Sequence, residues 1–176
     1  MRFLSRILIG LVVAGSGLWL ARARRHDLRR FAVNQFLEKP TNGRRYAELA
    51  DELHVSGERA ALRLERLKDG VAAREAARHV IGIERWGQRR LLVALGEPFE
   101  RDEHHPYKPP RDAALPELVS TFRETRAGTV DLARRLSDSP PSEGTRVEHN
   151  SLGPLSPRAW LRYLQTHADL ETRRAR

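Results

Sequence analysis

Three ionisable residues have the types and the spacing of a metal site: His79, His167 and Glu171. His167 and Glu171 are four residues apart, so a helix places them one turn apart on one face, where two side chains can chelate one ion. His79 falls on an apolar helical face elsewhere in the chain. If the two helices face each other, two imidazoles and a carboxylate converge. That ligand set suits Zn²⁺, Ni²⁺, Fe²⁺ or Mn²⁺ and leaves positions open for water or substrate.

Each of these residues also has an ordinary structural interpretation. A single histidine on an apolar stripe, such as His79, is usually a core residue with satisfied hydrogen bonds. His167 and Glu171 have the spacing of an exposed pair on the last turns of a terminal helix. Spacing alone does not separate these interpretations from a metal site, so both stay open.

Four further residues are secondary candidates. His149 precedes a Gly-Pro turn, and we expect it either to line the mouth of the site or to cap the loop. The adjacent pair His104-His105 cannot easily bind one ion and is attributed to a solvated loop. Glu84 lies five residues after His79, away from its face, and is expected in solvent or paired with a neighbouring helix. The chain has no cysteine, no nucleophile elbow and no phosphate-binding glycine loop.

Four helical stretches are predicted to position these side chains. They cover residues 44–68, 72–95, 116–136 and 156 to the C-terminus, separated by glycine- and proline-containing breaks. The second stretch has one apolar face that consists of Ala72, Ala76, His79, Ile83 and Trp86. The fourth has a stripe that changes from apolar to ionisable: Trp160, Leu164, His167 and Glu171.

Little in the sequence favours another fold. The run Val55-Ser56-Gly57 is expected to weaken the first stretch near its middle. Only residues 146–148 have an extended pattern, and they are isolated. We therefore predict an all-α fold, with a four-helix bundle over residues 41–176 preceded by an N-terminal hydrophobic helix.

The net charge of +9 is concentrated at the N-terminus. Residues 1–30 hold seven arginines and a single acid, Asp27, whereas the remaining 146 residues carry 25 basic and 22 acidic groups. The bundle itself is thus close to electrically balanced. It also lacks a basic stripe interleaved with aromatic residues, so we expect no nucleic-acid partner.

Fifteen uncharged residues lie between Arg6 and Arg22. As a helix they would cover about 22 Å, which is short for a hydrocarbon core of about 30 Å. We expect residues 7–21 to tether the chain to a membrane with the bundle in the cytoplasm, because more arginines follow the segment than precede it. Export after cleavage of a signal peptide and a soluble N-terminal helix are the alternatives. Residues 1–40, the segment and its basic arm, are expected to lie outside the core.

Two short motifs resemble those of the DinB/YfiT-like family of four-helix bundles. They are RHVIGIE at 78–84 and LGPLS at 152–156, the latter leading into Trp160-Leu161 and His167. The resemblance covers about residues 44–176. It implies a metal site with one histidine from the second helix and two from the last helix, four residues apart. His79 and His167 match the first two ligands, and Glu171 stands where the third histidine is expected.

The resemblance also implies a function. It points to a divalent-metal-dependent enzyme of the thiol-dependent S-transferase or hydrolase type, acting on a small-molecule or thiol substrate. Glu171 either changes the metal preference of the site or marks a relative that has lost its metal. The competing hypothesis is a non-enzymatic helical binding module without metal. Family members are often dimers, which makes a homodimer a further expectation.

Overall fold

The computed structural model describes residues 27–175, and the predicted hydrophobic segment 7–21 lies outside them. Residues 27–33 are helical and continue into a π-helix, η1 (Asn34–Glu38), and a 3-10 helix, η2 (Lys39–Thr41). Four long helices follow: α2 (Tyr46–Glu65), α3 (Val71–Ala94), α4 (Leu115–Asp138) and α5 (Pro157–Arg174). No helix within residues 27–175 has the length and apolar character needed to cross a membrane.

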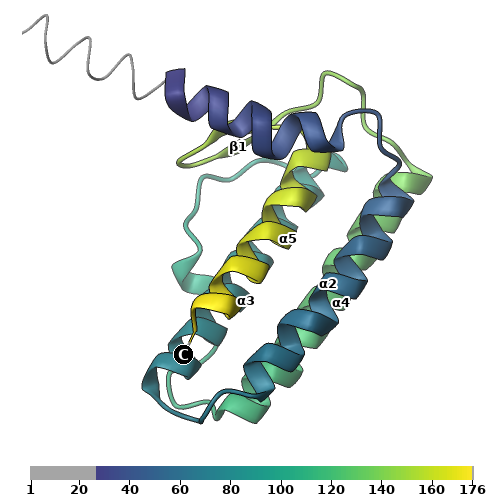
Figure 1. Cartoon of the computed structure of the whole chain (residues 1–176). Coiled ribbons are helices and arrows are strands. Elements are labelled where there is room, and N and C mark those ends of the chain that lie inside the picture. Colours follow the sequence, from purple (N-terminus) through teal and green to yellow (C-terminus); the bar gives the residue numbers. More distant parts are fainter. Residues whose placement is uncertain (1–26, 176) are drawn as a thin grey trace, which may run out of the picture.

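The four long helices pack side by side, as predicted (Figure 1). α2 contacts α4 and α5, and α3 contacts the same two helices, so α2 and α3 lie on one diagonal of the bundle. The ends of all four long helices lie within three residues of the predicted ends. At the start of α5 the Ser156 side chain accepts a hydrogen bond from the Ala159 N–H and caps the helix, as its predicted N-cap position requires. The all-α class is therefore confirmed.

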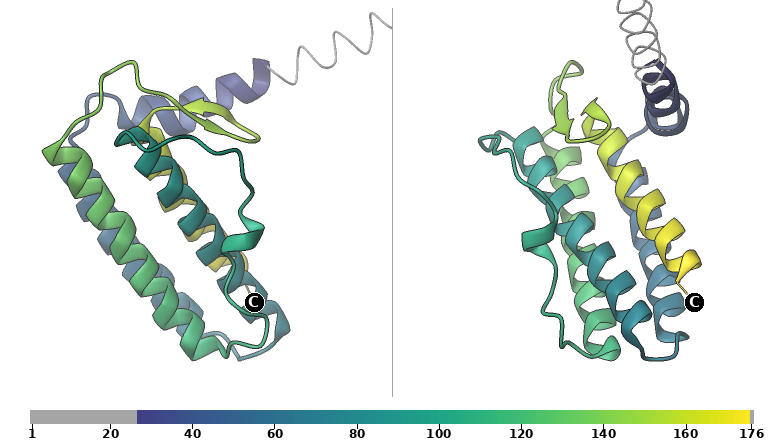
Figure 2. Two further views of the ribbon diagram at one scale, coloured as in Figure 1. Left: turned by 180° about the vertical axis from the view of Figure 1, so that it is seen from behind. Right: turned by 90° about the vertical axis from the view of Figure 1, so that its left-hand side faces the viewer.

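The connection between α3 and α4 runs the length of the bundle. Both helices run in the same direction, so residues 95–114 must return from one end of the molecule to the other (Figure 2). On the way the chain forms a short 3-10 helix, η3 (His105–Tyr107), that packs against α3. This path places a loop that is distant in sequence beside His79.

A short hairpin lies at the start of α5. Strand β1 (Val147–His149) pairs in antiparallel fashion with β2 (Gly153–Leu155), with Val147 opposite Leu155. The prediction that residues 146–148 are isolated was therefore wrong. Their partner strand was not recognised because it contains Gly153 and Pro154, two residue types that are rare in strands. The Trp160 indole N–H donates to the Val147 carbonyl at 3.0 Å, which ties the hairpin to α5.

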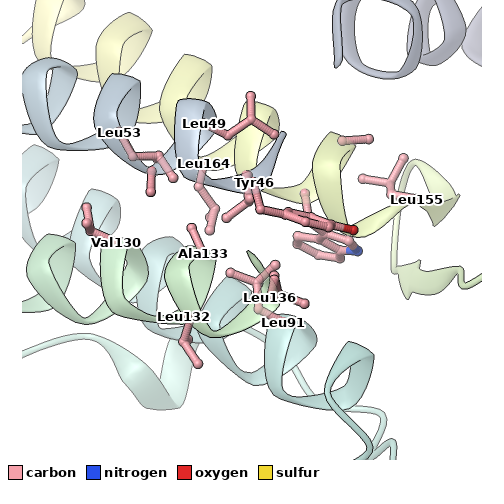
Figure 3. Packing of buried hydrophobic residues seen from close by; sticks show 14 of the residues in the cluster. Tyr46, Leu49, Leu53, Leu91, Val130, Leu132, Ala133, Leu136, Leu155 and Leu164 are labelled. Atoms are coloured by element: carbon pink, nitrogen blue, oxygen red, sulfur yellow. The ribbon is translucent and has the colours of Figure 1, made fainter. Parts of the chain in front are cut away.

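Leucine and aromatic side chains from every long helix fill the centre of the bundle. Figure 3 shows residues of one of the two core clusters, among them Tyr46, Leu49 and Leu53 of α2. On α3 the predicted face is confirmed at Ile83 and Trp86, which are buried, but at the start of the helix Ala73 and Ala77 are buried and Ala72 is exposed. His79 consequently lies at the border of the core.

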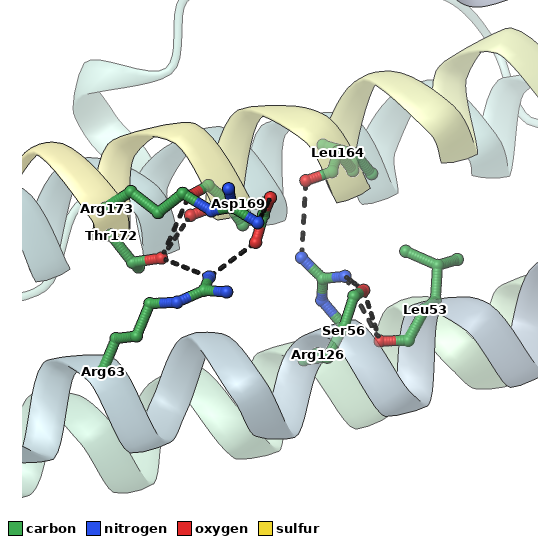
Figure 4. A network of polar contacts seen from close by, with 9 residues as sticks. Leu53, Ser56, Arg63, Arg126, Leu164, Asp169, Thr172 and Arg173 are labelled. Atoms are coloured by element: carbon green, nitrogen blue, oxygen red, sulfur yellow. Dashed lines mark hydrogen bonds and ion pairs between the residues drawn. The ribbon is translucent and has the colours of Figure 1, made fainter.

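A buried ion pair joins α3 and α4. The Arg126 guanidinium contacts both carboxylate oxygens of Glu84 at 2.9 Å, and the two side chains are 4% and 1% exposed. Arg126 also donates to the Leu53 and Leu164 carbonyls (Figure 4). Of the two expectations for Glu84, pairing with a neighbouring helix is the one confirmed.

Gly57 makes room for this pair. A Cβ at Gly57 would lie 2.5 Å from the Arg126 Cγ. Any larger residue at this position would therefore clash with the Arg126 side chain where it packs on α2. The helix is nevertheless continuous from Tyr46 to Glu65.

The segment before α2 belongs in part to the core, contrary to the expectation for residues 1–40. Leu37 is buried within the hydrophobic cluster, and the Thr41 hydroxyl donates to its carbonyl at 2.8 Å. The Glu38 carboxylate accepts hydrogen bonds from the Ser156 N–H at 2.9 Å and from its hydroxyl at 2.7 Å. The helical residues 34–41 therefore hold the start of α5.

Candidate metal centre

His79 of α3 and His167 of α5 meet across the interface between their helices. Their ring centroids lie 5.1 Å apart, with the ring planes tilted by 59°. Gly87 allows α5 to come this close, because a Cβ there would lie 2.5 Å from the Leu164 Cδ2. Two of the three predicted ligands are therefore neighbours in the fold.

A third imidazole, that of His104, packs on His79. Its ring centroid lies 5.2 Å from that of His79, in an edge-on arrangement. Gly82 admits the loop, since a Cβ at this position would lie 3.2 Å from the His104 carbonyl oxygen and 2.8 Å from the Lys108 Cγ. The attribution of His104 to a solvated loop was wrong, because the side chain is half-buried. The attribution holds for His105, which is exposed.

The environment of the cluster favours neutral imidazoles. Burial, and then the neighbouring histidines His79, His104 and His149, lower the pKa of His167 to about 3. Burial is also the main cause that lowers the pKa of His79 and of His104. A neutral imidazole has a free ring nitrogen lone pair, which is the form that binds a metal ion or accepts a proton.

Glu171 lies near the cluster but is engaged elsewhere. Its half-buried carboxylate pairs with Arg174 at 3.3 Å. Its charge raises the pKa of His79 against the effect of burial, and it adds to the burial that raises the pKa of Tyr163 to about 12. Within residues 27–175, no three His, Asp or Glu side chains are arranged to hold one metal ion. The described structure therefore assembles an imidazole pair with a third imidazole beside it, and not a completed ligand set.

His149 takes the loop-capping role. Its Nδ1 accepts hydrogen bonds from the backbone N–H groups of Ser151 and Leu152 at 3.1 and 3.2 Å. The ring is 6% exposed and its Nε2 has no hydrogen-bond partner in the described structure. It lies 5.1 Å from the Trp160 ring and 4.7 Å from the Tyr163 ring. Burial lowers its pKa to about 4.

The rings form a continuous row along α5. From His149 the row passes to Tyr163, which lies 5.7 Å from His167, and then to His79 and His104. Its outer end is flanked by a cavity of about 540 Å³ whose lining includes His105 and Lys108. A small molecule bound in this cavity would lie beside the loop that carries His104.

Among the candidate site residues, the position of His104 could not be predicted from the sequence. Its contact with His79 depends on the return path of residues 95–114, which no local spacing encodes. The one local signal is Gly82, a glycine inside a helix, which indicates the close approach of another segment.

Comparison of the chain with known protein families, with curated proteins and with solved structures gives no match. The relationship to the DinB/YfiT-like family therefore stays a prediction based on the two short motifs.

Proposed function

We propose that this chain is a membrane-tethered, DinB-like protein that binds a divalent metal ion at His79 and His167. The observation that carries the proposal is the 5.1 Å approach of these two rings from different helices. Metal-ligating imidazoles bind in the neutral form, and the lowered pKa values of both histidines favour that form. The imidazole pair thus has the donor chemistry that Zn²⁺, Ni²⁺, Fe²⁺ or Mn²⁺ requires.

The third donor would be Glu171 or His104. Glu171 is the residue that the family resemblance points to, and its carboxylate would have to leave Arg174. His104 already packs on His79, and it would not have to leave an ion pair to bind the metal. The two choices differ in charge, because only the carboxylate would neutralise part of the charge of the metal.

The proposed activity is metal-dependent transfer or hydrolysis, with a small molecule or thiol as substrate. When bound, a divalent metal ion lowers the pKa of a coordinated water or thiol. The residues of this chain would orient the metal, and the basic cavity beside Lys108 would attract the substrate. Tyr163 is protonated at neutral pH, as any tyrosine with a pKa of 10 or above is, and burial raises its pKa further, to about 12, so its hydroxyl can serve as a hydrogen-bond donor.

Metal binding to the full chain, purified without a histidine tag, tests the proposal. We expect one metal ion per chain by elemental analysis, and its loss in the variants His79→Ala and His167→Ala. His54→Ala is the matched control, because His54 is exposed on α2. Comparing Glu171→Gln with His104→Ala identifies the third donor. A wild-type chain without bound metal after loading with each of the four ions would contradict the proposal.

The alternative is a non-enzymatic helical binding module in which the row of rings is packing alone. It is favoured by the lack, within residues 27–175, of three side chains arranged to hold a metal ion. In that case His79→Leu would be neutral or stabilising, since a half-buried imidazole without a partner costs free energy. A fall in the melting temperature when a chelator is added would count against this alternative.

A further inference from the structure

Residues 27–43 cross the end of the bundle beside the hairpin (Figure 1). A second cavity, of about 780 Å³, is lined by residues of this segment and of the hairpin. It is distinct from the imidazole cluster and shares no lining residue with the cavity beside Lys108. Five of its lining side chains are cationic, and they come from three separate parts of the chain: Arg29, Arg30, Lys39, Arg146 and Arg158.

None of these five cations forms an ion pair within residues 27–175, although many other arginines of the bundle do. Residues 1–26 contain no Asp or Glu that could supply one. The hydrogen bonds that three of them make go to backbone carbonyls, as Arg29 does to Ser151 at 2.9 Å and Arg158 to Arg44 at 2.7 Å. Carbonyl oxygens leave the positive charge uncompensated.

The two carboxylates of the cavity do not change this balance. They belong to Glu38 and Glu143. Glu38 is held by the backbone and hydroxyl of Ser156, and Glu143 forms no ion pair in the described structure. Cations thus outnumber carboxylates in the cavity, which gives it the character of an anion site.

Apolar side chains stand exposed on the same helical segment. Leu28, Phe31 and Phe36 are 68%, 60% and 70% exposed. Basic residues and large apolar side chains together on one short helix are typical of segments that lie in a membrane interface. Leu28 is only seven residues beyond the end of the apolar run at 7–21. If that run tethers the chain to a membrane, the three exposed apolar side chains would lie near the membrane surface.

We propose that this cavity binds the phosphate-bearing headgroup of an anionic phospholipid. Each arginine guanidinium can donate two parallel hydrogen bonds to the oxygens of one phosphate group. Lys39 adds a further positive charge to the lining. Leu28, Phe31 and Phe36 would enter the interfacial layer while the headgroup fills the cavity. The proposal shares the membrane location with the proposed function but not the metal site, so the two can fail separately.

The test measures how the full chain partitions between two kinds of vesicle. One is phosphatidylcholine alone, and in the other part of it is replaced by phosphatidylglycerol. Residues 7–21 are uncharged, so they contribute equally to partitioning into both kinds of vesicle. The ratio of the two partition coefficients therefore removes their contribution. We expect the ratio to fall about tenfold or more in the double variant Arg30→Glu/Arg146→Glu, because each basic residue near an anionic surface contributes about fivefold.

The matched control is Arg59→Glu/Arg135→Glu, which changes the net charge equally at exposed positions on α2 and α4. An unchanged ratio in this control, with the fall confined to the cavity variant, supports the proposal. An equal fall in both variants, or none in either, overturns it. Stabilisation of the wild type by glycerol phosphate or inorganic phosphate, without any preference for anionic vesicles, overturns the lipid assignment in favour of a soluble phosphate. Metal content measured on the same samples keeps the result separate from the proposed function.

Discussion

The imidazole of His79 on α3 and that of His167 on α5 lie 5.1 Å apart although 88 positions separate them in the chain. Their contact depends on how closely α3 and α5 approach. The distance between the helices is set at a point one to two turns away from the two histidines. There the Leu164 side chain packs directly on the backbone of Gly87. The geometry of the candidate site is therefore a consequence of helix packing.

Gly87→Ala should separate the two helices. The new Cβ would lie 2.5 Å from the Leu164 Cδ2 and 3.0 Å from its Cγ, so the whole Leu164 side chain would have to shift, and it is buried in the core. Overpacking costs about 1–3 kcal/mol, and the better helix propensity of alanine offsets at most about 1 kcal/mol. Denaturant unfolding should therefore show a less stable protein. Gly144→Ala, where nothing lies within 4 Å, is the control. Equal or higher stability of the Gly87 variant would contradict the packing argument.

Removing one member of the Glu84–Arg126 pair should be costly. Glu84→Leu leaves a buried guanidinium without its carboxylate, and such a loss costs about 3–5 kcal/mol. The double variant Glu84→Leu/Arg126→Met should lose much less than the sum of the two single variants. The exposed pair Arg134–Asp131 is the comparison, and breaking it should cost at most about 1 kcal/mol. Strict additivity at Glu84 and Arg126 would show that the pair does not act as a unit.

His149 should make the fold sensitive to acid. Its pKa is lowered to about 4 in the folded chain against an ordinary 6.5, so the unfolded chain takes up the proton first as the pH falls. His149 therefore has no effect on the free energy of unfolding above pH 6.5. Between pH 6.5 and about 4 it lowers this free energy by about 1.4 kcal/mol for each pH unit.

The variant His149→Asn isolates this effect, because asparagine can still accept hydrogen bonds from the following turn but does not titrate. Unfolding measured at pH 7.5 and again near pH 5 should show a smaller decrease for the variant than for the wild type. Parallel decreases would assign the acid sensitivity to other groups.

Glu38→Ala tests whether residues 34–41 are part of the folded unit. The carboxylate holds both the backbone and the hydroxyl of Ser156 at the start of α5. Losing hydrogen bonds to a charged acceptor should cost about 2 kcal/mol in thermal or denaturant unfolding. Glu148→Ala, at an exposed position of β1, should change stability little. A negligible effect at Glu38 would mean that this segment does not stabilise the bundle.

Local patterns were sufficient for the long helices. Helical periodicity and the breaks at glycine and proline located all four long helices, because these signals act within a few residues. The stripe on α5 correctly indicated the change from the buried Trp160 and Leu164 to the half-buried His167 and Glu171. The hairpin was missed because Gly153 and Pro154 suppress any strand pattern in β2.

The sequence by itself determined that His79 and His167 lie on helices with apolar faces and that Glu171 shares a face with His167. Only the tertiary structure decided that α3 faces α5, that the return loop carries His104 to His79, and that Glu84 is paired inside the core. The physical reason is that a helical face fixes which side chains can meet a neighbour but not which neighbour it is. That choice depends on the joint packing of all the helices, and here small residues such as Gly82 and Gly87 permit the close contacts.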